Sequence, residues 1–341
     1  MAGNSSVAAV QATNDDASAS KLSCVSKGYI EDKYVRFFVR RPLKRSPIIN
    51  RGYYSRWAAM RKLVLQFLEG ADPRRAAGTQ PRKQVLSLGA GFDTLFFQLK
   101  DEGRAPHLFV EMDFLEVTSR KAAIIASHGE LVANLGPEVE IHKEKGEILS
   151  DHYKLLPADL RDLNGLDTVF KRAGLDSSLP TVVIAECVLI YLDPQVSRAV
   201  VKWAAEKLTT AIFVIYEQIH PHDAFGQQMI KNLESRGCGL LGLEDTPTLE
   251  AKMKRFTDLG WQNADALNMD VIYNQHLDPI DRRRIERLEI FDEFEEWHIM
   301  QEHYCVAFGI NDPTGILEHV GFSIPKSVAP HLGQSKSFSG T

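Results

Sequence analysis

An apolar run that closes on two glycines decides the fold: QVLSLGAG, residues 84–91. A second run, LFVEMD, follows at 108–113 and ends on Asp113. Apolar runs of this length, bounded by turn residues, are typical of parallel strands that helices cover on both faces. Open α/β sheets bind their ligands at the carboxyl ends of such strands. The two runs therefore predict a nucleotide-type ligand held by Gly89, Gly91 and Asp113.

The spacing between the glycine loop and Asp113 indicates which ligand the loop holds. An acidic side chain about 20 residues after such a loop is placed to accept hydrogen bonds from both hydroxyls of an adenosine ribose. Asp93, however, stands at the start of the next predicted helix, where a dinucleotide would place its pyrophosphate. Two like charges about 4 Å apart repel by roughly 4 kcal/mol at an effective dielectric near 20, so Asp93 disfavours a phosphate. S-adenosylmethionine has the ribose, no phosphate and two cationic groups. We predict it as the cofactor, with S-adenosylhomocysteine as the product.

Polar residues recur at the ends of two further predicted strands. Residues 153–158 precede Asp159 and Leu160, and residues 181–185 precede Glu186. Taken singly, each carboxylate is typical of a solvated turn, and a glycine loop alone is also typical of a tight strand-to-helix turn that binds nothing. Together at one edge of a sheet, these residues favour a cofactor pocket.

The composition is that of an ordinary globular protein. The 341 residues are 44% hydrophobic and 25% charged, enough apolar material for one large α/β domain. A net charge of -5 argues against a general nucleic-acid or membrane-surface binder. The four cysteines have no Cys-x-x-Cys spacing, so we predict no metal. Neither a secretory signal nor an apolar stretch of about 20 residues is visible, and we expect a cytoplasmic monomer.

Strands and helices alternate along most of the chain, after a helix predicted over 55–69. Strict alternation implies right-handed crossovers and a mostly parallel sheet with helices on both faces. The later strands, near 261–267 and 304–309, would bring the sheet to seven strands. The alternating strands are predicted at 84–88, 108–113, 153–158, 181–185 and 211–216, and the helices near 93–99, 115–127, 163–173, 194–208 and 249–259.

The pattern also divides the chain into segments. We expect a disordered tail over 1–20, a single domain over 21–322 and a flexible tail over 323–341. An insertion interrupts the sheet after its fifth strand. The segments expected within the domain are a helical cap or lid (21–80), a cofactor-binding core (84–216), a substrate-side insertion (217–260) and C-terminal strands and helices (261–322).

Five motifs in order resemble the leucine carboxyl methyltransferases, a family that acts on the catalytic subunit of protein phosphatase 2A. The motifs are INRGYYSR (49–56), LGAGFDT (88–94), ADLRDL (158–163), AECVLIY (185–191), and YEQ (216–218) leading to DAFG (223–226). The resemblance covers nearly the whole chain beyond the amino-terminal tail. It implies a class I S-adenosylmethionine-dependent methyltransferase fold. It also implies methyl esterification of the C-terminal leucine carboxylate in the tail of that subunit, which regulates assembly of the phosphatase holoenzyme.

The resemblance implies which residues contact the cofactor. They are Lys21, Arg56, Gly89, Asp113, Asp159, Leu160 and Glu186, to which the shape of the loop adds Gly91. For Lys21 the alternative is an ordinary exposed lysine, and for Arg56 it is a surface ion pair. A peptide's terminal carboxylate is already ionised at neutral pH, so no catalytic triad is predicted. We predict that Arg56 and Tyr191 orient this carboxylate, although an aromatic that merely packs at the rim is equally typical of Tyr191.

Other functions stay open at this stage. One is O-methyl transfer to a carboxylate of a small molecule or of a tRNA base. The tRNA relatives append a kelch-type propeller, and no periodic blades follow residue 310 here. The small-molecule relatives usually carry arginine where Leu95 follows Thr94. A different class is a non-catalytic scaffold that holds phosphatase subunits, against which the intact set of cofactor residues speaks.

Overall fold

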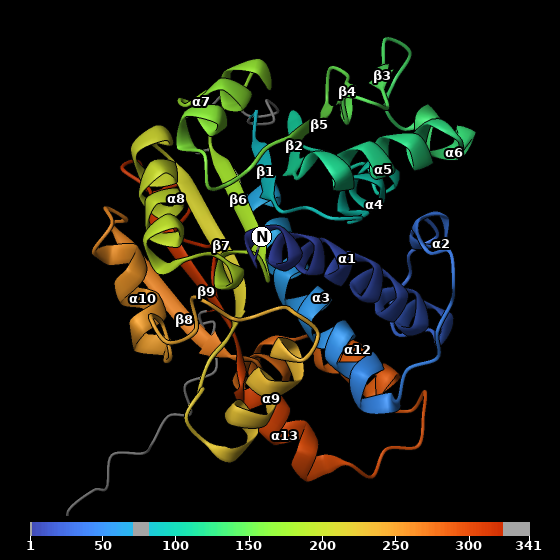
Figure 1. Cartoon of the computed structure of the whole chain (residues 1–341), viewed down its shortest axis with the longest axis vertical. Helices are drawn as coiled ribbons and strands as arrows, with labels where there is room; N and C mark the ends of the chain where they lie inside the picture. Colours follow the sequence, from blue (N-terminus) through green and yellow to red (C-terminus); the bar gives the residue numbers. More distant parts are fainter. Residues whose placement is uncertain (1, 71–81, 323–341) are drawn as a thin grey trace, which may run out of the picture.

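The computed structural model describes residues 2–70 and 82–322, and its centre is one sheet with helices on both faces (Figure 1). The five central strands pair in parallel, while the strands at both edges pair antiparallel. Across the sheet, the nine strands of the described residues are β3 (Glu140–His142), β4 (Glu147–Leu149), β5 (Tyr153–Pro157), β2 (Leu108–Asp113), β1 (Gln84–Leu88), β6 (Thr181–Glu186), β7 (Ala211–Gln218), β9 (Tyr304–Asn311) and β8 (Asn263–Asn268).

The register at the centre of the sheet brings the predicted site residues to one edge. Val85 in β1 lies opposite Phe109 in β2 and opposite Val182 in β6. All five residues of β1 are buried, as predicted for a strand covered on both faces. The three parallel strands end side by side. Asp113 and Glu186, the last residues of β2 and β6, therefore flank the loop that follows β1.

Two groups of helices cover the two faces, because successive side chains of β1 point in opposite directions. Val85 belongs to the apolar core that includes α3 (Pro47–Glu69), α4 (Leu95–Asp101) and α5 (Leu115–Ala126). Leu86 belongs to the core that includes α7 (Leu163–Arg172), α8 (Pro194–Lys207) and α10 (Leu249–Thr257). The other helices of the described residues are α1 (Ala2–Ser26), α2 (Val35–Phe38), α6 (Gly129–Ala133), η1 (Leu189–Tyr191), α9 (Ala224–Glu234), α11 (Met269–Val271), η2 (Ile272–His276), α12 (Pro279–Ile285) and α13 (Phe294–Glu302).

The sheet has two more strands than the seven predicted. All seven predicted strands are present, and the additional pair is the hairpin of β3 and β4, three residues each, which extends the sheet beyond β5. The hairpin is rich in charged residues, and its short strands carry too few apolar side chains for a sequence pattern. The parallel character predicted for the sheet therefore describes its five central strands.

The amino-terminal segment was expected to be a disordered tail over residues 1–20, but its described residues are helical. Helix α1 covers Ala2–Ser26 and packs on α3. The side chains of Ser20, Ser23 and Cys24 are buried there, and the Ser23 hydroxyl donates to Asn50 Oδ1 at 2.9 Å. Small side chains let two helices approach closely. In the sequence alone, however, a segment of small and polar residues is typical of a disordered tail, which is why this helix was not predicted. The flexible tail predicted over 323–341 lies outside the described residues, and the other segment boundaries stay predictions.

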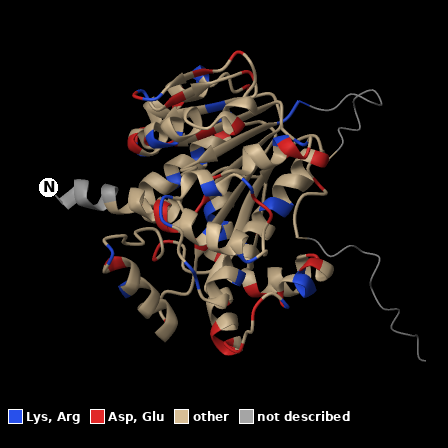
Figure 2. Cartoon of the chain, turned by 90° about the vertical axis from the view of Figure 1, so that its right-hand side faces the viewer, with Lys and Arg blue, Asp and Glu red and all other residues tan. Residues whose placement is uncertain are grey.

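Charges of both signs are mixed on the side of the molecule that Figure 2 faces. Figure 2 shows lysines and arginines interspersed with aspartates and glutamates over the helices on that side of the molecule. Within residues 2–70 and 82–322, no helix combines the length and apolar character that crossing a membrane requires.

Candidate functional site

The glycine loop turns sharply after β1 and is fastened to Asp113. Gly89 and Gly91 have φ angles of 63° and 52°, in the left-handed region that favours glycine. The backbone N–H of Gly91 donates to Asp113 Oδ2 at 2.7 Å, and that of Phe114 donates to Oδ1 at 2.7 Å. Burial raises the pKa of Asp113, against these two hydrogen bonds. Each carboxylate oxygen keeps a second lone pair, so Asp113 can still accept hydrogen bonds from a ligand.

Helix α1 lies over this loop. Asn14 accepts a hydrogen bond from the backbone N–H of Phe92 through its Oδ1, at 2.8 Å. A Cβ on Gly91 would come within 2.6 Å of the same oxygen. Sequence reasoning missed Asn14 because the segment that carries it was expected to be disordered. Helix α1 therefore covers the glycine loop at the carboxyl ends of the parallel strands.

Lys21 is the first of the two predicted cations, and it is held inside a cluster of polar groups. Its Nζ lies 2.7 Å from Thr94 Oγ1, 3.1 Å from Asp32 Oδ2 and 3.3 Å from Asp93 Oδ1. Burial opposes the charge, but the carboxylates of Asp32 and Asp93 outweigh it and raise the pKa of Lys21. The alternative of an ordinary exposed lysine is therefore wrong. Asp32, whose side chain is fully buried, was not singled out in the sequence.

Arg56 is the second predicted cation, and α3 points it at the end of β6. Its Nε donates to Glu186 Oε1, and its guanidinium lies 4.8 Å from the ring centre of Tyr216 and 5.5 Å from that of Tyr53. Burial opposes the charge, yet Glu186 outweighs it and raises the pKa of Arg56. The side chains of Arg56 and Glu186 are 19% and 34% exposed, so this ion pair is half-buried. Arg56 and Glu186 were both predicted as site residues, and the structure brings them together.

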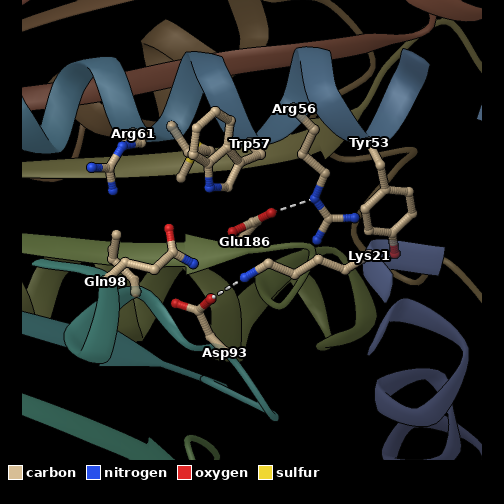
Figure 3. A pocket seen from close by; sticks show the side chains of 10 residues that line it. Lys21, Tyr53, Arg56, Trp57, Arg61, Asp93, Gln98 and Glu186 are labelled. Carbon is tan, nitrogen blue, oxygen red and sulfur yellow. Dashed lines mark hydrogen bonds and ion pairs between the residues drawn. The ribbon is translucent and has the colours of Figure 1, made fainter. Parts of the chain in front are cut away.

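These groups line one cavity of about 70 Å³ between α3, α4 and the strand ends (Figure 3). Five of the lining residues are charged, three cations and two carboxylates. The lining residues are Lys21, Tyr53, Arg56, Trp57, Met60, Arg61, Asp93, Leu95, Gln98 and Glu186.

Six predicted residues do not line this cavity: Gly89, Gly91 and Asp113 of the glycine loop described above, and Asp159, Leu160 and Tyr191. Asp159 follows β5 and forms a bidentate ion pair with Arg161, at 2.9 Å and 2.6 Å, which lowers the pKa of Asp159. Leu160 next to it is buried. Tyr191 ends the short helix η1 and packs against an apolar cluster of the insertion that includes Met229. Burial raises the pKa of Tyr191, so its hydroxyl stays protonated and able to donate.

Buried polar side chains behind the glycine loop hold the backbone of Asp93 in place. Lys121 Nζ donates to the Asp93 backbone carbonyl at 2.8 Å and also to Glu111. The Tyr153 hydroxyl donates to the same Glu111 oxygen at 2.8 Å. Burial raises the pKa of Glu111 to about 7, against the attraction of Lys121. A glutamate inside an otherwise apolar strand was the signal in the sequence, because a buried carboxylate requires a partner.

The space around Gly89 gives the first testable prediction. In Gly89→Ala the new Cβ would lie 2.6 Å from Val188 Cγ2, at a φ of 63° that disfavours alanine. The loop must shift, and we expect the affinity for S-adenosylhomocysteine, measured by calorimetry, to fall by about tenfold to a hundredfold. Gly103→Ala is the control, because Gly103 has a similar φ of 68° with no atom near the added Cβ. Unchanged affinity in Gly89→Ala would place the cofactor elsewhere.

The fold and this edge define the class of the protein. A parallel sheet with a glycine loop after β1 and an aspartate at the end of β2 is that of a class I S-adenosylmethionine-dependent methyltransferase. The sequence profile of the leucine carboxyl methyltransferase family matches residues 9–205. The chain is 60% identical to "Leucine carboxyl methyltransferase 1 homolog" of Arabidopsis thaliana over 316 residues, 93% of each chain. It belongs to the leucine carboxyl methyltransferase family.

Other similar proteins carry two different names. "Leucine carboxyl methyltransferase 1" of Rattus norvegicus is 39% identical over 303 residues, 88% of this chain and 89% of the rat protein. "tRNA wybutosine-synthesizing protein 4" of Homo sapiens is 42% identical over 305 residues, 87% of this chain and 43% of the human protein. Among solved structures, a magnesium protoporphyrin IX methyltransferase from Synechocystis with bound S-adenosylhomocysteine matches with a TM-score of 0.41 and 12% identity, over 81% of this chain and 92% of that chain.

S-adenosylmethionine is the cofactor, and the residues at the sheet edge suit it. Asp113 offers acceptors for ribose hydroxyls, and the glycines leave room for close approach of a ligand. Asp93 and Glu186 add two carboxylates to the lining of the neighbouring cavity, which suits a ligand with cationic groups. No cluster of three or more histidine, cysteine, aspartate or glutamate side chains in the described ranges is arranged to hold a metal.

Proposed function

We propose that this chain methyl-esterifies the α-carboxylate of a C-terminal leucine, in the tail of the protein phosphatase 2A catalytic subunit, and so regulates assembly of the phosphatase holoenzyme. The observation that carries the proposal is Arg56, a guanidinium only 19% exposed that α3 places beside Glu186 at the end of β6. Membership of the leucine carboxyl methyltransferase family supports the same substrate class. We further propose that the protein acts in the cytoplasm as a monomer.

The proposed roles follow from the chemistry of a carboxylate. A terminal carboxyl group has an ordinary pKa of about 3.3–3.7, so the attacking oxygen needs no general base at neutral pH. When bound, S-adenosylmethionine supplies an activated methyl group. Arg56 holds the incoming carboxylate by charge, and Tyr191 donates its hydroxyl to it. Alignment and removal of water from both charges then account for the rate.

We propose that the cofactor is held by residues of six segments. Asp113 accepts from the ribose, while the backbone at Gly89 and Gly91 lies against the cofactor. The other contacts come from α1 and α3 through Lys21 and Arg56, from the end of β5 through Asp159 and Leu160, and from the end of β6 through Glu186.

One relative's name favours a second candidate. The human protein named for wybutosine synthesis in tRNA is 42% identical over most of this chain, so methyl transfer to a carboxylate of a tRNA base is the alternative that deserves a direct test. A small-molecule carboxylate and a non-catalytic phosphatase scaffold complete the alternatives. The three catalytic candidates differ in what receives the methyl group, and the scaffold transfers none.

The test is methyl transfer from labelled S-adenosylmethionine to three acceptors: the intact phosphatase catalytic subunit, the same subunit without its terminal leucine, and total tRNA. Label on the intact subunit alone is the expected result. Label on tRNA alone would move the activity to the wybutosine-type alternative. Binding of the cofactor without label on any acceptor would overturn both and leave the small-molecule carboxylate or the scaffold.

A further inference from the structure

Two hydrogen-bond donors in the cavity of Figure 3 have no acceptor among the described residues, whereas both predicted cations, Lys21 and Arg56, form ion pairs. Arg56 is paired with Glu186, and Lys21 is paired with Asp32 and Asp93. By contrast, Trp57 Nε1 and Arg61 Nη1 are both buried and find no hydrogen-bond partner within residues 2–70 and 82–322. Both side chains line the cavity. Since a buried donor left unpaired bears its full cost of desolvation, two of them in one cavity point to a missing acceptor.

The two donors form a fixed pair on α3. Four residues apart, Trp57 and Arg61 lie on one side of the helix, and the guanidinium lies 5.4 Å from the indole ring centre. The other end of Arg61 is anchored, because its Nη2 donates to Glu102 outside the cavity. Figure 3 shows both side chains descending from α3, with Gln98 on the opposite wall. Anchoring at Glu102 leaves Nη1 as the guanidinium nitrogen available to a ligand.

The chemistry of the acceptor follows from the donors and the space. A guanidinium N–H and an indole N–H donate only, so the ligand supplies acceptors, and a guanidinium N–H donates most strongly to an anionic oxygen. A carboxylate has two oxygens, one for each donor. The cavity of about 70 Å³ is roughly twice the 30 Å³ that one water occupies in the liquid, enough for a carboxylate group. Asp93 and Glu186 do not repel it strongly, because Lys21 and Arg56 neutralise them.

We propose that Trp57 and Arg61 form a carboxylate-binding subsite next to Arg56. Two carboxylates meet at this edge of the sheet: that of the amino-acid end of the cofactor, and the terminal carboxylate of the peptide. The second source rests on the proposed function, whereas the first requires only that the protein binds its cofactor. Trp57 Nε1 donates to one oxygen and Arg61 Nη1 to the other.

The experiment compares two ligands that differ in this carboxylate. S-adenosylhomocysteine has it, and 5′-methylthioadenosine lacks the amino-acid end. Calorimetric affinities are measured for the wild type, for Trp57→Phe, which keeps an aromatic ring, and for Arg61→Lys, which keeps the charge. We expect both variants to bind S-adenosylhomocysteine about tenfold more weakly and 5′-methylthioadenosine within about twofold of the wild type. The control is Lys62→Met, on the same helix but with its Nζ on the His276 carbonyl away from the cavity, which should leave both affinities within about twofold.

A second arm separates the two sources. If both variants leave the cofactor affinities unchanged but raise KM for a peptide ending in leucine by about tenfold, the subsite holds the peptide's carboxylate. Equal weakening of both nucleosides, or no change in any of these quantities, would overturn the subsite. If the wild type does not methylate the leucine peptide, the proposed function is wrong. The proposal of a carboxylate subsite is not affected by that result, because the comparison of the two nucleosides does not depend on the methyl acceptor.

Discussion

Arg56→Gln should lower kcat/KM for methyl transfer by roughly two to three orders of magnitude while the protein stays folded. The glutamine removes a buried charge and leaves Glu186 unpaired beside the incoming carboxylate. Truncating one partner of a buried charge pair costs about 2–5 kcal/mol, and each 1.36 kcal/mol is a factor of ten in rate. Initial rates with labelled cofactor and varied peptide measure the loss, and thermal unfolding checks the fold.

Two variants on α3 serve as comparisons. Arg56→Lys keeps the charge without the planar fork, so its rate should fall between those of the wild type and Arg56→Gln. Lys62→Met changes a cation whose Nζ donates to the His276 carbonyl at 2.6 Å, away from the cavity, and its rate should stay within about twofold. If Arg56→Gln retained more than half of the wild-type rate, Arg56 would have no part in the reaction.

The sequence predicted the centre of the sheet well because burial there is strong and continuous. The bounds of β1 and β2 agree with the prediction, since each is a short apolar run with a glycine or a turn at its end. The sharp turn after β1 lies where the two glycines stand, because glycine adopts positive φ more readily than other residues. The cations at the site needed the family resemblance, since no local pattern marks Lys21 or Arg56.

What the sequence did not reveal depends on contacts between distant segments. Asn14 and Asp32 serve the site only because α1 and the chain after it fold back over the glycine loop. The unpaired donors of Trp57 and Arg61 can be identified only in the three-dimensional structure. In the sequence, both residues have the spacing of ordinary members of an amphipathic helix. Hydrophobic pattern encodes which residues are buried but not which polar groups meet.

Glu217→Gln should cost about 3–5 kcal/mol of unfolding free energy, the largest loss of stability that we expect from one exchange. Glu217 lies in β7 and is fully buried, although the sequence placed it at the start of the insertion. Its Oε2 accepts from Lys252 and, at 2.9 Å, from Arg255, both also buried. Despite burial, these two cations lower the pKa of Glu217 and keep it ionised.

Removing this one carboxylate leaves two buried cations without their counter-charge, which is why the cost exceeds that of an ordinary hydrogen bond. Urea unfolding at neutral pH measures it. The matched control is Glu206→Gln, which breaks an exposed pair with Lys202 one helical turn away and should change the free energy by less than about 1 kcal/mol. A loss in Glu217→Gln no larger than in the control would mean that water reaches Lys252 and Arg255. Lys252 and Arg255 tie α10 to the end of β7, so this water would weaken one of the polar contacts between the insertion and the sheet.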